Sequence, residues 1–215
     1  MIISFESGRL GNQLFQYCGL KKLFKNELIL FVGMDAFRST FNNTELGKRA
    51  IFTEKIVQLF GKKILHYVAS ELHIIGYAKE YDTFRECKYS IKKGLLNKIV
   101  YFDTAYFQNE NMIDDEIASS IQIKYNLLKN AEDIHKKLPE DRAEIFFVHI
   151  RRGDYISWPA CQPAILPLRW YHEQMDQIRT IFRKPFFVLV SDDKPYAEKM
   201  FGNRTYTMSA RRTCC

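Results

Sequence analysis

Two adjacent arginines, Arg151 and Arg152, are the residues whose types and spacing point most directly to chemistry, and they follow the apolar run 144–150. Guanidinium groups at the end of a buried strand are costly to desolvate unless an anion binds them, and their planar forks match a pyrophosphate. Gly153 allows a close backbone turn, and Asp154 can orient an arginine or accept a proton. On the pattern alone, an anion site and an ordinary surface arginine pair are equally good interpretations.

His149, inside the same apolar run, is a further group that can move a proton near neutral pH. A histidine in such a strand is more often a hydrogen-bonded structural residue than a catalytic base. We therefore predict a structural histidine from the pattern, and the role of a base is the alternative.

A second cluster lies near the N-terminus, in the segment Gly8-Arg9-Leu10-Gly11-Asn12-Gln13. The segment joins a predicted strand to a predicted helix, where free backbone N–H groups can bind an anion or a hydroxyl group. Its spacing differs from the G-x-G-x-x-G of dinucleotide-binding proteins. Asn12 is a suitable helix N-cap, so a capped tight turn without a ligand is the simpler interpretation of these residues on their own.

The third cluster, Ser191-Asp192-Asp193, follows another apolar run. Its carboxylates could bind ribose or sugar hydroxyl groups. They could equally cap a helix and complement its dipole. Capping is the interpretation that we favour from these residues alone.

Hydrophobic patterning predicts the elements that position these clusters. Five short apolar runs are typical of strands, at 2–5, 27–32, 98–102, 144–150 and 185–190. Helical patterns lie over 12–25 and 169–182, and the second has one apolar stripe of Trp170, Met175, Ile178 and Phe182. The chain therefore contains two βαβ units, and we predict an α/β protein whose ligand sites lie at the carboxyl ends of its strands.

The region between these units is harder to interpret. Two short amphipathic pieces, at 51–60 and 64–72, are separated by Gly61, and we expect helices and loops there. A further helix is predicted over 127–137. The composition changes from charged to strongly apolar after 138–142, which indicates a domain boundary.

The chain has 215 residues, and its 32 Lys and Arg against 25 Asp and Glu give a formal net charge of +7. This charge favours phosphate-bearing partners, nucleic acid or an acidic membrane surface. The lysines are scattered and no base-stacking motif is present, so we predict no nucleic-acid partner. No apolar run approaches the roughly 20 residues that cross a bilayer.

Five cysteines, an odd number without a C-x-x-C pair, indicate a reducing compartment and no structural zinc. The first residues lack the pattern of a secretory signal. We therefore expect a cytoplasmic protein, and peripheral contact with the inner face of the membrane is the alternative.

Taken together, the clusters resemble the bacterial α-1,2-fucosyltransferases of glycosyltransferase family 11. Residues 8–17 are similar to the family's G-x-L-G-N-Q-x-F-Q-Y block, and residues 149–155 to its H-x-R-R-G-D-Y block. Tyr106-Phe107-Gln108 and Ser191-Asp192-Asp193 are weaker matches to an aromatic-Gln block and to an S-D-D block. The resemblance extends to about Tyr196.

The resemblance implies a GT-B-like fold of two Rossmann-like lobes that face a cleft. It implies transfer of fucose, with inversion and without a metal or other cofactor, from GDP-fucose to the 2-hydroxyl of a galactose-terminated glycan. Arg152, with Arg151, would neutralise the departing diphosphate. Asp154 and His149 are both candidates for the base that takes the acceptor proton, and the resemblance does not decide between them.

The resemblance also implies further donor-binding residues. The first lobe would contribute the loop residues Gly11, Asn12 and Gln13. In the second lobe, Asp192 or Asp193 would hold guanosine or ribose.

The chain departs from the family pattern near its end. Family members are roughly a third longer, and a Trp-rich block of the donor lobe has no counterpart here. We therefore expect an N-terminal acceptor-side lobe over 1–140, an incomplete donor lobe over 141–199 and an aberrant tail over 200–215 without strand or helix periodicity. Two strands alone would leave a sheet edge unpaired, which predicts impaired turnover. A non-catalytic GDP-sugar-binding remnant and another nucleotide-sugar glycosyltransferase are the alternatives.

Overall fold

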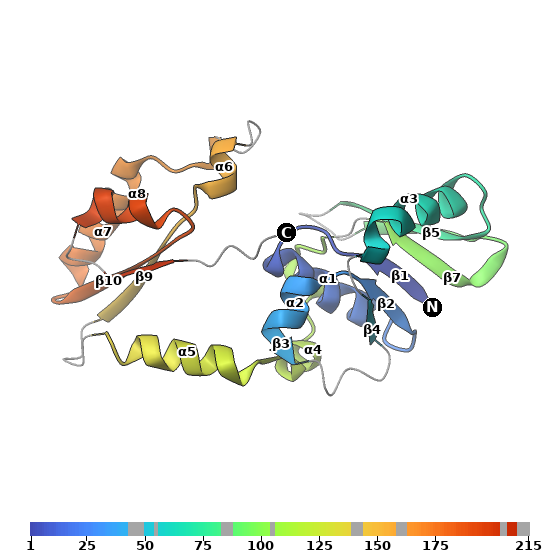
Figure 1. The fold of residues 1–215 in the computed structure, drawn as a ribbon, viewed down its shortest axis with the longest axis horizontal. Coiled ribbons are helices and arrows are strands. Elements are labelled where there is room, and N and C mark those ends of the chain that lie inside the picture. The colour runs from blue at the N-terminus through green and yellow to red at the C-terminus, as the bar shows by residue number, and fades with distance from the viewer. Residues whose placement is uncertain are drawn as a thin grey trace. The chain divides into compact units, whose positions relative to one another are not determined.

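The computed structural model describes residues 1–42, 50–53, 56–82, 88–103, 106–138, 144–157, 163–202 and 206–209. The chain divides into two compact units, Met1–Leu128 and Lys129–Cys215, and each is described by itself (Figure 1). The division falls within the helix α5 (Tyr125–His135). The sequence places the boundary after this helix, at residue 140.

A six-stranded sheet forms the centre of the first unit, in the order β4-β2-β1-β7-β5-β6. Neighbouring strands run parallel, except β5 and β6, which are antiparallel. The strands are β1 (Ile2–Phe5), β2 (Ile29–Val32), β4 (Ala50–Thr53), β5 (Ile75–Asp82), β6 (Lys88–Lys92) and β7 (Leu96–Asp103). The predicted strands at 2–5, 27–32 and 98–102 and the predicted parallel βαβ unit are confirmed.

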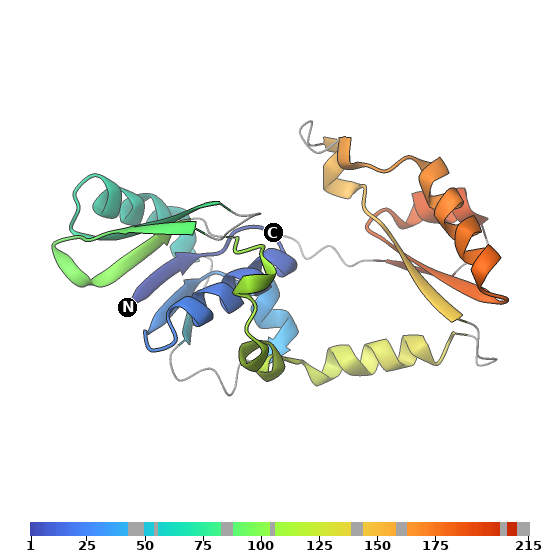
Figure 2. The same cartoon turned by 180° about the vertical axis from the view of Figure 1, so that it is seen from behind.

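The central strands β1 and β2 are buried on both faces, because they carry apolar side chains to either side, whereas β6 at the edge is exposed along its length. On one face, Ile2 and Phe31 pack against the helix α1 (Leu10–Leu23). On the other face, Ile3 and Tyr101 pack against α3 (Ile56–Ser70), and both helices can be followed in Figure 2. The smaller elements are α2 (Asp35–Thr40), β3 (Phe41–Asn42), η2 (Glu110–Met112), α4 (Asp115–Ser120) and β8 (Gln122–Ile123).

The middle of the first unit differs from the prediction. Gly61 does not separate two pieces but lies inside α3, and the strand β5 follows it. Residues 50–53 form a strand instead of the start of a helix. One interior glycine costs a helix only about 1 kcal/mol, which the packing of α3 on the sheet outweighs.

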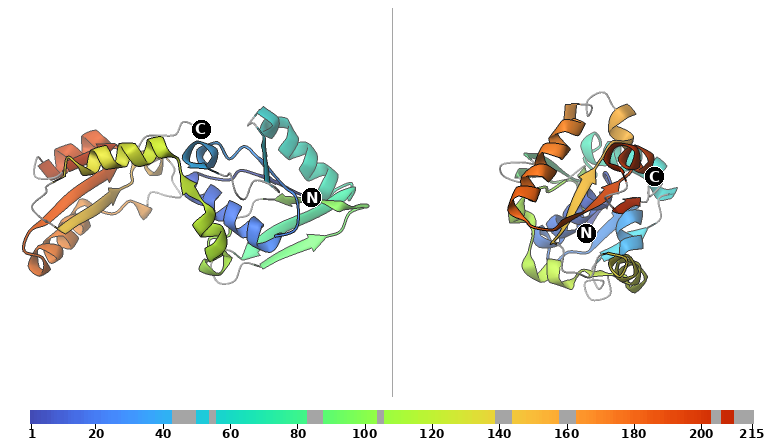
Figure 3. Two further views of the ribbon diagram at one scale, coloured as in Figure 1. Left: turned by 90° about the horizontal axis from the view of Figure 1, so that it is seen from below. Right: turned by 90° about the vertical axis from the view of Figure 1, so that its left-hand side faces the viewer.

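The second unit is built on three parallel strands in the order β11-β10-β9. They are β9 (Glu144–Ile150), β10 (Pro185–Ser191) and β11 (Tyr206–Ser209), and β9 and β10 lie side by side in Figure 3. The helices α7 (Leu168–Ile181) and α8 (Lys194–Phe201) pack over the same face of the sheet, where Tyr171 and Ala197 contact Ile150 and Leu189. The short helix α6 (Gly153–Ser157) follows β9. The second predicted βαβ unit is confirmed.

Two details of the second unit differ from the predictions. The tail contains a strand, because β11 pairs with β10 over Tyr206–Ser209, so the sheet has three strands instead of two. In α7, Tyr171 and Met175 are buried whereas Trp170 of the predicted stripe is exposed. On the sheet face opposite α7 and α8, Phe147 is 67% exposed.

Every helix in the described ranges falls short of the length or the apolar character that spanning a bilayer requires.

Candidate functional site

In the second unit, Asp192 links the carboxyl ends of β9 and β10. Its carboxylate accepts hydrogen bonds from the backbone N–H groups of Arg152 at 2.9 Å and Gly153 at 3.1 Å. Ser191 adds another link, because its hydroxyl donates to the carbonyl oxygen of Ile150 at 2.9 Å. The conformation of the arginine turn therefore depends on residues of the following strand end.

Asp193 caps α8. Its Oδ1 accepts a hydrogen bond from the backbone N–H of Tyr196 at 3.2 Å, and its own N–H donates to the Ser191 hydroxyl at 3.0 Å. This agrees with the helix-capping interpretation of the sequence. Since both Asp192 and Asp193 bind the backbone, their contacts with guanosine or ribose stay predictions.

The guanidinium group of Arg152 lies over the ring of Tyr196, with Cζ 3.7 Å from the ring centroid. Its Nε lies 3.5 Å from Oδ2 of Asp193, and the side chain is 26% exposed. This Nε is buried and makes no hydrogen bond within the described residues. Because this Nε is buried beside the Asp193 carboxylate, an anionic ligand would accept from the exposed part of the guanidinium fork.

The side chain of Arg151 has a different aromatic partner. Its Cζ lies 4.4 Å from the ring centroid of Tyr155, which belongs to α6. The two adjacent arginines thus stack on rings from two different helices, which restricts the orientation of each guanidinium group. Their joint binding of a diphosphate stays a prediction.

The side chain of His149 is exposed and makes no hydrogen bond within the part of the chain that the structure describes. Alternation along β9 places it opposite Ile150, and so on the sheet face away from α7 and α8. The prediction of a hydrogen-bonded structural histidine is therefore wrong. Asp154 lies in α6, but its side chain is outside the described residues, so its proposed role as a base stays a prediction.

In the first unit, the Gly-Asn-Gln loop joins β1 to α1. The helix begins at Leu10, with Arg9 in the N-cap position and no capping hydrogen bond from its side chain. Asn12 therefore lies inside the first turn, and the prediction that it is the N-cap is wrong. The uncapped first turn leaves backbone N–H groups at the positive end of the helix dipole.

Asn12 is held from two sides. Its Oδ1 accepts a hydrogen bond of 2.7 Å from Nε2 of Gln108, whereas its Nδ2 makes none within the described residues. Gly8 has a φ of +74°, and a Cβ at this position would lie 2.1 Å from Nδ2 of Asn12. Gly8 is therefore needed both for the turn and for the space that the Asn12 amide occupies.

Gln13 is buried and bonded at both ends of its amide. Its Nε2 donates to Oε2 of Glu6 at 3.0 Å, and its Oε1 accepts from the backbone N–H of Phe37 at 2.8 Å. The same Glu6 oxygen accepts from the backbone N–H of Met34 at 2.9 Å. This geometry makes Gln13 a residue that fixes the loop against α2, and its contact with the donor stays a prediction.

Glu80 is a functional candidate that was not predicted from the sequence. This buried carboxylate accepts hydrogen bonds from the backbone N–H groups of Tyr106 at 2.6 Å and Phe107 at 3.1 Å. It thereby places Gln108 against Asn12. The Tyr106-Phe107-Gln108 motif was visible in the sequence, but Glu80 lies in a polar stretch of β5 with no motif to single it out.

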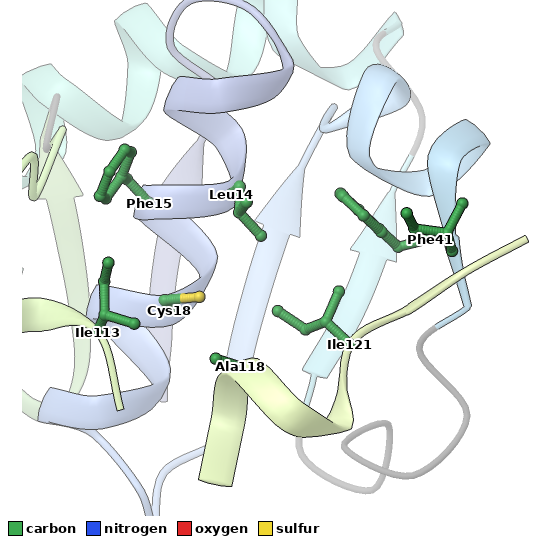
Figure 4. Close-up of a pocket in the computed structure, with 8 residues that line it drawn as sticks. Leu14, Phe15, Cys18, Phe41, Ile113, Ala118 and Ile121 are labelled. Carbon is green, nitrogen blue, oxygen red and sulfur yellow. The ribbon is translucent and has the colours of Figure 1, made fainter. Parts of the chain in front are cut away.

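The first unit also contains an apolar pocket of about 280 Å³ between α1, α4, β3 and β8 (Figure 4). Its lining residues are Leu14, Phe15, Cys18, Phe41, Ile113, Ala118, Ile121 and Ile123. The lining offers almost no polar group, so this pocket does not suit a hydroxyl-rich sugar or a diphosphate. Within the described ranges, no three His, Cys, Asp or Glu side chains form a group that could hold a metal ion.

Comparison with known proteins gives one family and two kinds of relative. The family model of glycosyl transferase family 11 matches residues 4–206. The O-antigen biosynthesis glycosyltransferase WbnK of Escherichia coli is 28% identical over 232 residues, which cover 92% of this chain and 74% of the relative.

Among solved structures, NodZ alpha-1,6-fucosyltransferase soaked with GDP-fucose is similar with a TM-score of 0.58 at 12% identity, over 98% of this chain and 77% of NodZ. Fucosyltransferase NodZ from Bradyrhizobium gives a TM-score of 0.57 at 12% identity, over 99% and 78%. These likenesses confirm the predicted α/β, GT-B-like fold. Since the family model spans nearly the whole chain, this protein belongs to glycosyltransferase family 11 and is a glycosyltransferase.

Proposed function

We propose that this glycosyltransferase moves fucose from GDP-β-L-fucose to the 2-hydroxyl of a galactose unit, with inversion and without a metal ion. Membership of family 11 supports sugar transfer. The GDP-fucose named for the structurally similar NodZ supports the donor. The similarity of residues 8–17 and 149–155 to the α-1,2-fucosyltransferase blocks supports the linkage.

The arrangement of Arg152 is the observation that carries the proposal. Negative charge accumulates on the GDP diphosphate as the bond to the sugar carbon C1 lengthens. A cation that is already fixed lowers the barrier most, because it need not reorganise at that moment. Tyr196 and Asp193 hold the Arg152 guanidinium in this way, and the exposed part of its fork is available to an anion.

The remaining chemistry is a single displacement. The acceptor oxygen attacks C1 on the face opposite the diphosphate through an oxocarbenium-like state, which inverts the configuration. A base must take the acceptor proton. Asp154 and His149 are the two candidates predicted from the sequence. The imidazole of His149 has no hydrogen-bond partner among the described residues that would orient it.

We propose that the other predicted residues bind the donor. In the first unit, the uncapped first turn of α1 at Gly11 and the Nδ2 of Asn12, unbonded among the described residues, are suitable hydrogen-bond donors, and Gln13 fixes the loop that carries them. In the second unit, Asp192 and Asp193 would hold guanosine or ribose with carboxylate oxygens.

We also propose a cytoplasmic location, and peripheral contact at the inner face of the membrane is the alternative. The odd number of cysteines supports a reducing compartment, and the net charge of +7 supports contact with an acidic surface. Sedimentation with vesicles that contain anionic lipid, at low and high salt, tests the membrane part.

Incubation of the 215-residue chain with GDP-fucose and lactose tests the reaction. The expected product is fucosyl-lactose with an α-1,2 linkage, identified by NMR of the purified trisaccharide. Parallel reactions with GDP-mannose and UDP-galactose examine donor choice.

The same reactions distinguish the alternatives. Binding of GDP-fucose without any product would identify a non-catalytic binding remnant. Product from a different nucleotide sugar would identify another glycosyltransferase. Fucose on a hydroxyl other than the galactose 2-hydroxyl would contradict the proposed linkage.

A further inference from the structure

The turn that joins β6 to β7 carries an exposed apolar surface at one end of the first unit. Leu95 is 82% exposed and Leu96 is 50% exposed. Leu72 and Ile74, which follow α3, are 48% and 36% exposed. Single exposed apolar residues are normal on a protein surface, but four in adjoining segments indicate a contact surface. We name these four residues the Leu95 patch, and the site described above does not use them.

Backbone hydrogen bonds hold the two segments of the patch together. The N–H of Leu95 donates to the carbonyl oxygen of His73 at 2.8 Å, and the N–H of Leu96 donates to that of Ile74 at 2.7 Å. Gly94 lies against the start of β5, because a Cβ on Gly94 would be 2.2 Å from the backbone of the first residue of that strand. The turn is thus packed closely on β5, while its leucine side chains stay exposed.

Three exposed lysines lie next to the patch. Lys92 is the last residue of β6, Lys93 follows it in the turn, and Lys98 lies near the start of β7. None of the three forms an ion pair within the described residues. Two carboxylates are near them: Glu71 precedes the patch in the sequence, and Glu27 pairs with the N-terminal amine at 3.0 Å. The charge around the patch is therefore positive.

The patch lies at the end of the sheet opposite the candidate site of the first unit. Since β1, β5 and β7 run parallel, their amino ends share one edge of the sheet. The patch is at this edge, where the Met1 amine donates to the carbonyl oxygen of Lys98 at 2.6 Å (Figure 1). The Gly-Asn-Gln loop and Gln108 follow the carboxyl ends of β1 and β7. A partner on the patch would leave these residues uncovered.

The combination of projecting leucines and lysines suits a lipid surface. Apolar side chains enter the boundary between headgroups and acyl chains, and the long lysine side chains bring their ammonium groups to anionic headgroups. Protein–protein interfaces, in contrast, are depleted in lysine. The positive charge around the patch therefore favours an anionic bilayer over a protein as the partner.

We propose that the Leu95 patch is the surface by which this chain binds an anionic lipid bilayer. Leu95 and Leu96 enter the headgroup boundary, and Lys92, Lys93 and Lys98 bind the phosphate groups of the lipids. The inference names the surface for the peripheral membrane contact that was given above as the alternative location. It does not depend on the sugar that the enzyme transfers.

The variant Leu95→Ser tests the apolar part of the surface. The parent should co-sediment with vesicles of equal parts phosphatidylglycerol and phosphatidylcholine at about 0.1 M salt. Leu95→Ser should weaken vesicle affinity by about tenfold, because the apolar side chain that leaves water is lost. Ile181→Ser is the matched control, since Ile181 is 73% exposed on α7 of the second unit. Because both residues are highly exposed, the melting temperatures should stay close to that of the parent.

Lys92→Gln combined with Lys93→Gln tests the charged part. Each lysine near an anionic bilayer contributes about fivefold to affinity, so the pair should account for about 25-fold. The matched control is Lys136→Gln combined with Lys137→Gln, which removes the same charge from an exposed pair in the second unit. Binding of the parent should also fall at high salt and with vesicles of phosphatidylcholine alone.

The variant Leu95→Trp reports whether this position enters the bilayer. Its fluorescence, measured as the difference from the parent, should shift to shorter wavelength when anionic vesicles are added, and brominated lipid should quench it. Ile181→Trp should show neither change. An unshifted, unquenched signal from Leu95→Trp on bound protein would contradict the insertion of Leu95.

The outcomes separate this proposal from the proposed reaction. Lactose is a soluble acceptor, so transfer of fucose to it should be equal in the parent, in Leu95→Ser and in the lysine variant. A parent that transfers no fucose but binds vesicles through the patch would refute the reaction alone. Vesicle binding by Leu95→Ser or by the lysine variant with the affinity of the parent would refute the patch as the membrane surface.

Two further results would also overturn the proposal. A parent that binds no anionic vesicles would refute membrane contact altogether. Self-association of the parent in sedimentation equilibrium, without vesicle binding and abolished by Leu95→Ser, would assign the patch to a second copy of this chain.

Discussion

At the scale of single residues, Arg152 combines a charge with three contacts that fix its place. Its backbone N–H binds Asp192, its guanidinium stacks on Tyr196 and its Nε lies near Asp193. A lysine keeps the charge but has neither the planar fork nor the stacking surface. The interactions lost with the fork are hydrogen bonds to a charged group, each about 1.5–3 kcal/mol.

We therefore predict that Arg152→Lys raises the Kd for GDP by about 10–100-fold, nearly as much as Arg152→Ala. The melting temperature should change little, because the carboxylate of Asp192 binds the backbone at this position and not the side chain. Isothermal titration calorimetry gives the affinity. Arg169→Lys is the control, since Arg169 is highly exposed and pairs only with Glu173 of its own helix among the described residues. Wild-type affinity in Arg152→Lys would remove the diphosphate role.

The candidate site residues that could be predicted are those whose residue type is unusual at their place in the sequence. Adjacent arginines after an apolar strand are rare enough to be noticed, and the structure places them beside aromatic rings and Asp193. Glu80 was not predictable, because its partners are the backbone N–H groups of Tyr106 and Phe107, 26 and 27 positions along the chain. Nothing in the local spacing of the chain encodes those contacts.

At the scale of elements, α1 carries two glycines in opposite environments. A Cβ on Gly11 would meet nothing within 4 Å. A Cβ on Gly19 would lie 2.5 Å from the ring of Phe107, whose loop Glu80 holds in place. The helix thus has one glycine that packing requires and one that it does not.

We predict opposite effects of alanine at these two positions. Gly11→Ala should stabilise the protein by about 0.5–1 kcal/mol through helix propensity. Gly19→Ala should destabilise it by about 1–3 kcal/mol, because Phe107 must move. Urea denaturation measures both, and each variant is the control for the other.

Gly11→Ala also examines the proposed donor contact of this helix end. A phosphate or sugar that approaches the Gly11 backbone closely would meet the new methyl group, so GDP-fucose affinity should fall although stability rises. Unchanged affinity would show that the donor does not reach this residue.

The strands were the most predictable elements, since continuous apolar runs such as 144–150 and 185–190 are typical of a buried parallel sheet. The helix α3 and the strand β11 were not, for two physical reasons. Gly61 resembles a break although packing carries the helix through it. Residues 206–209 become a strand only because β10 offers them an edge to pair with.

At the scale of the whole molecule, buried acidic groups of the first unit make its stability depend on alkaline pH. Burial, with a smaller contribution from Asp114, raises the pKa of Cys18 from 9.0 to about 11. Burial likewise raises the pKa of Tyr17 and Tyr77, which also belong to the first unit. Between these values the unfolded chain releases protons that the folded unit retains, so the free energy of unfolding falls as the pH rises.

We predict that the urea midpoint followed by circular dichroism decreases between pH 9 and 11, and that Cys18→Ala makes this decrease smaller. Below pH 9 both proteins should show the same pH dependence, which serves as the internal control. Equal slopes above pH 9 would contradict the prediction. Trp158 and Trp170 both belong to the second unit, so tryptophan fluorescence separates its response from that of the first.

The bond between Asp192 and the backbone of Arg152 also has a consequence for synthesis of the chain. The two residues are 40 positions apart, so the arginine segment leaves the ribosome well before the carboxylate that fixes it. During this interval the nascent protein lacks the ordered turn and should not retain nucleotide. Nucleotide binding should begin only once β10 and Asp192 have emerged. The second unit therefore becomes able to bind nucleotide late in translation.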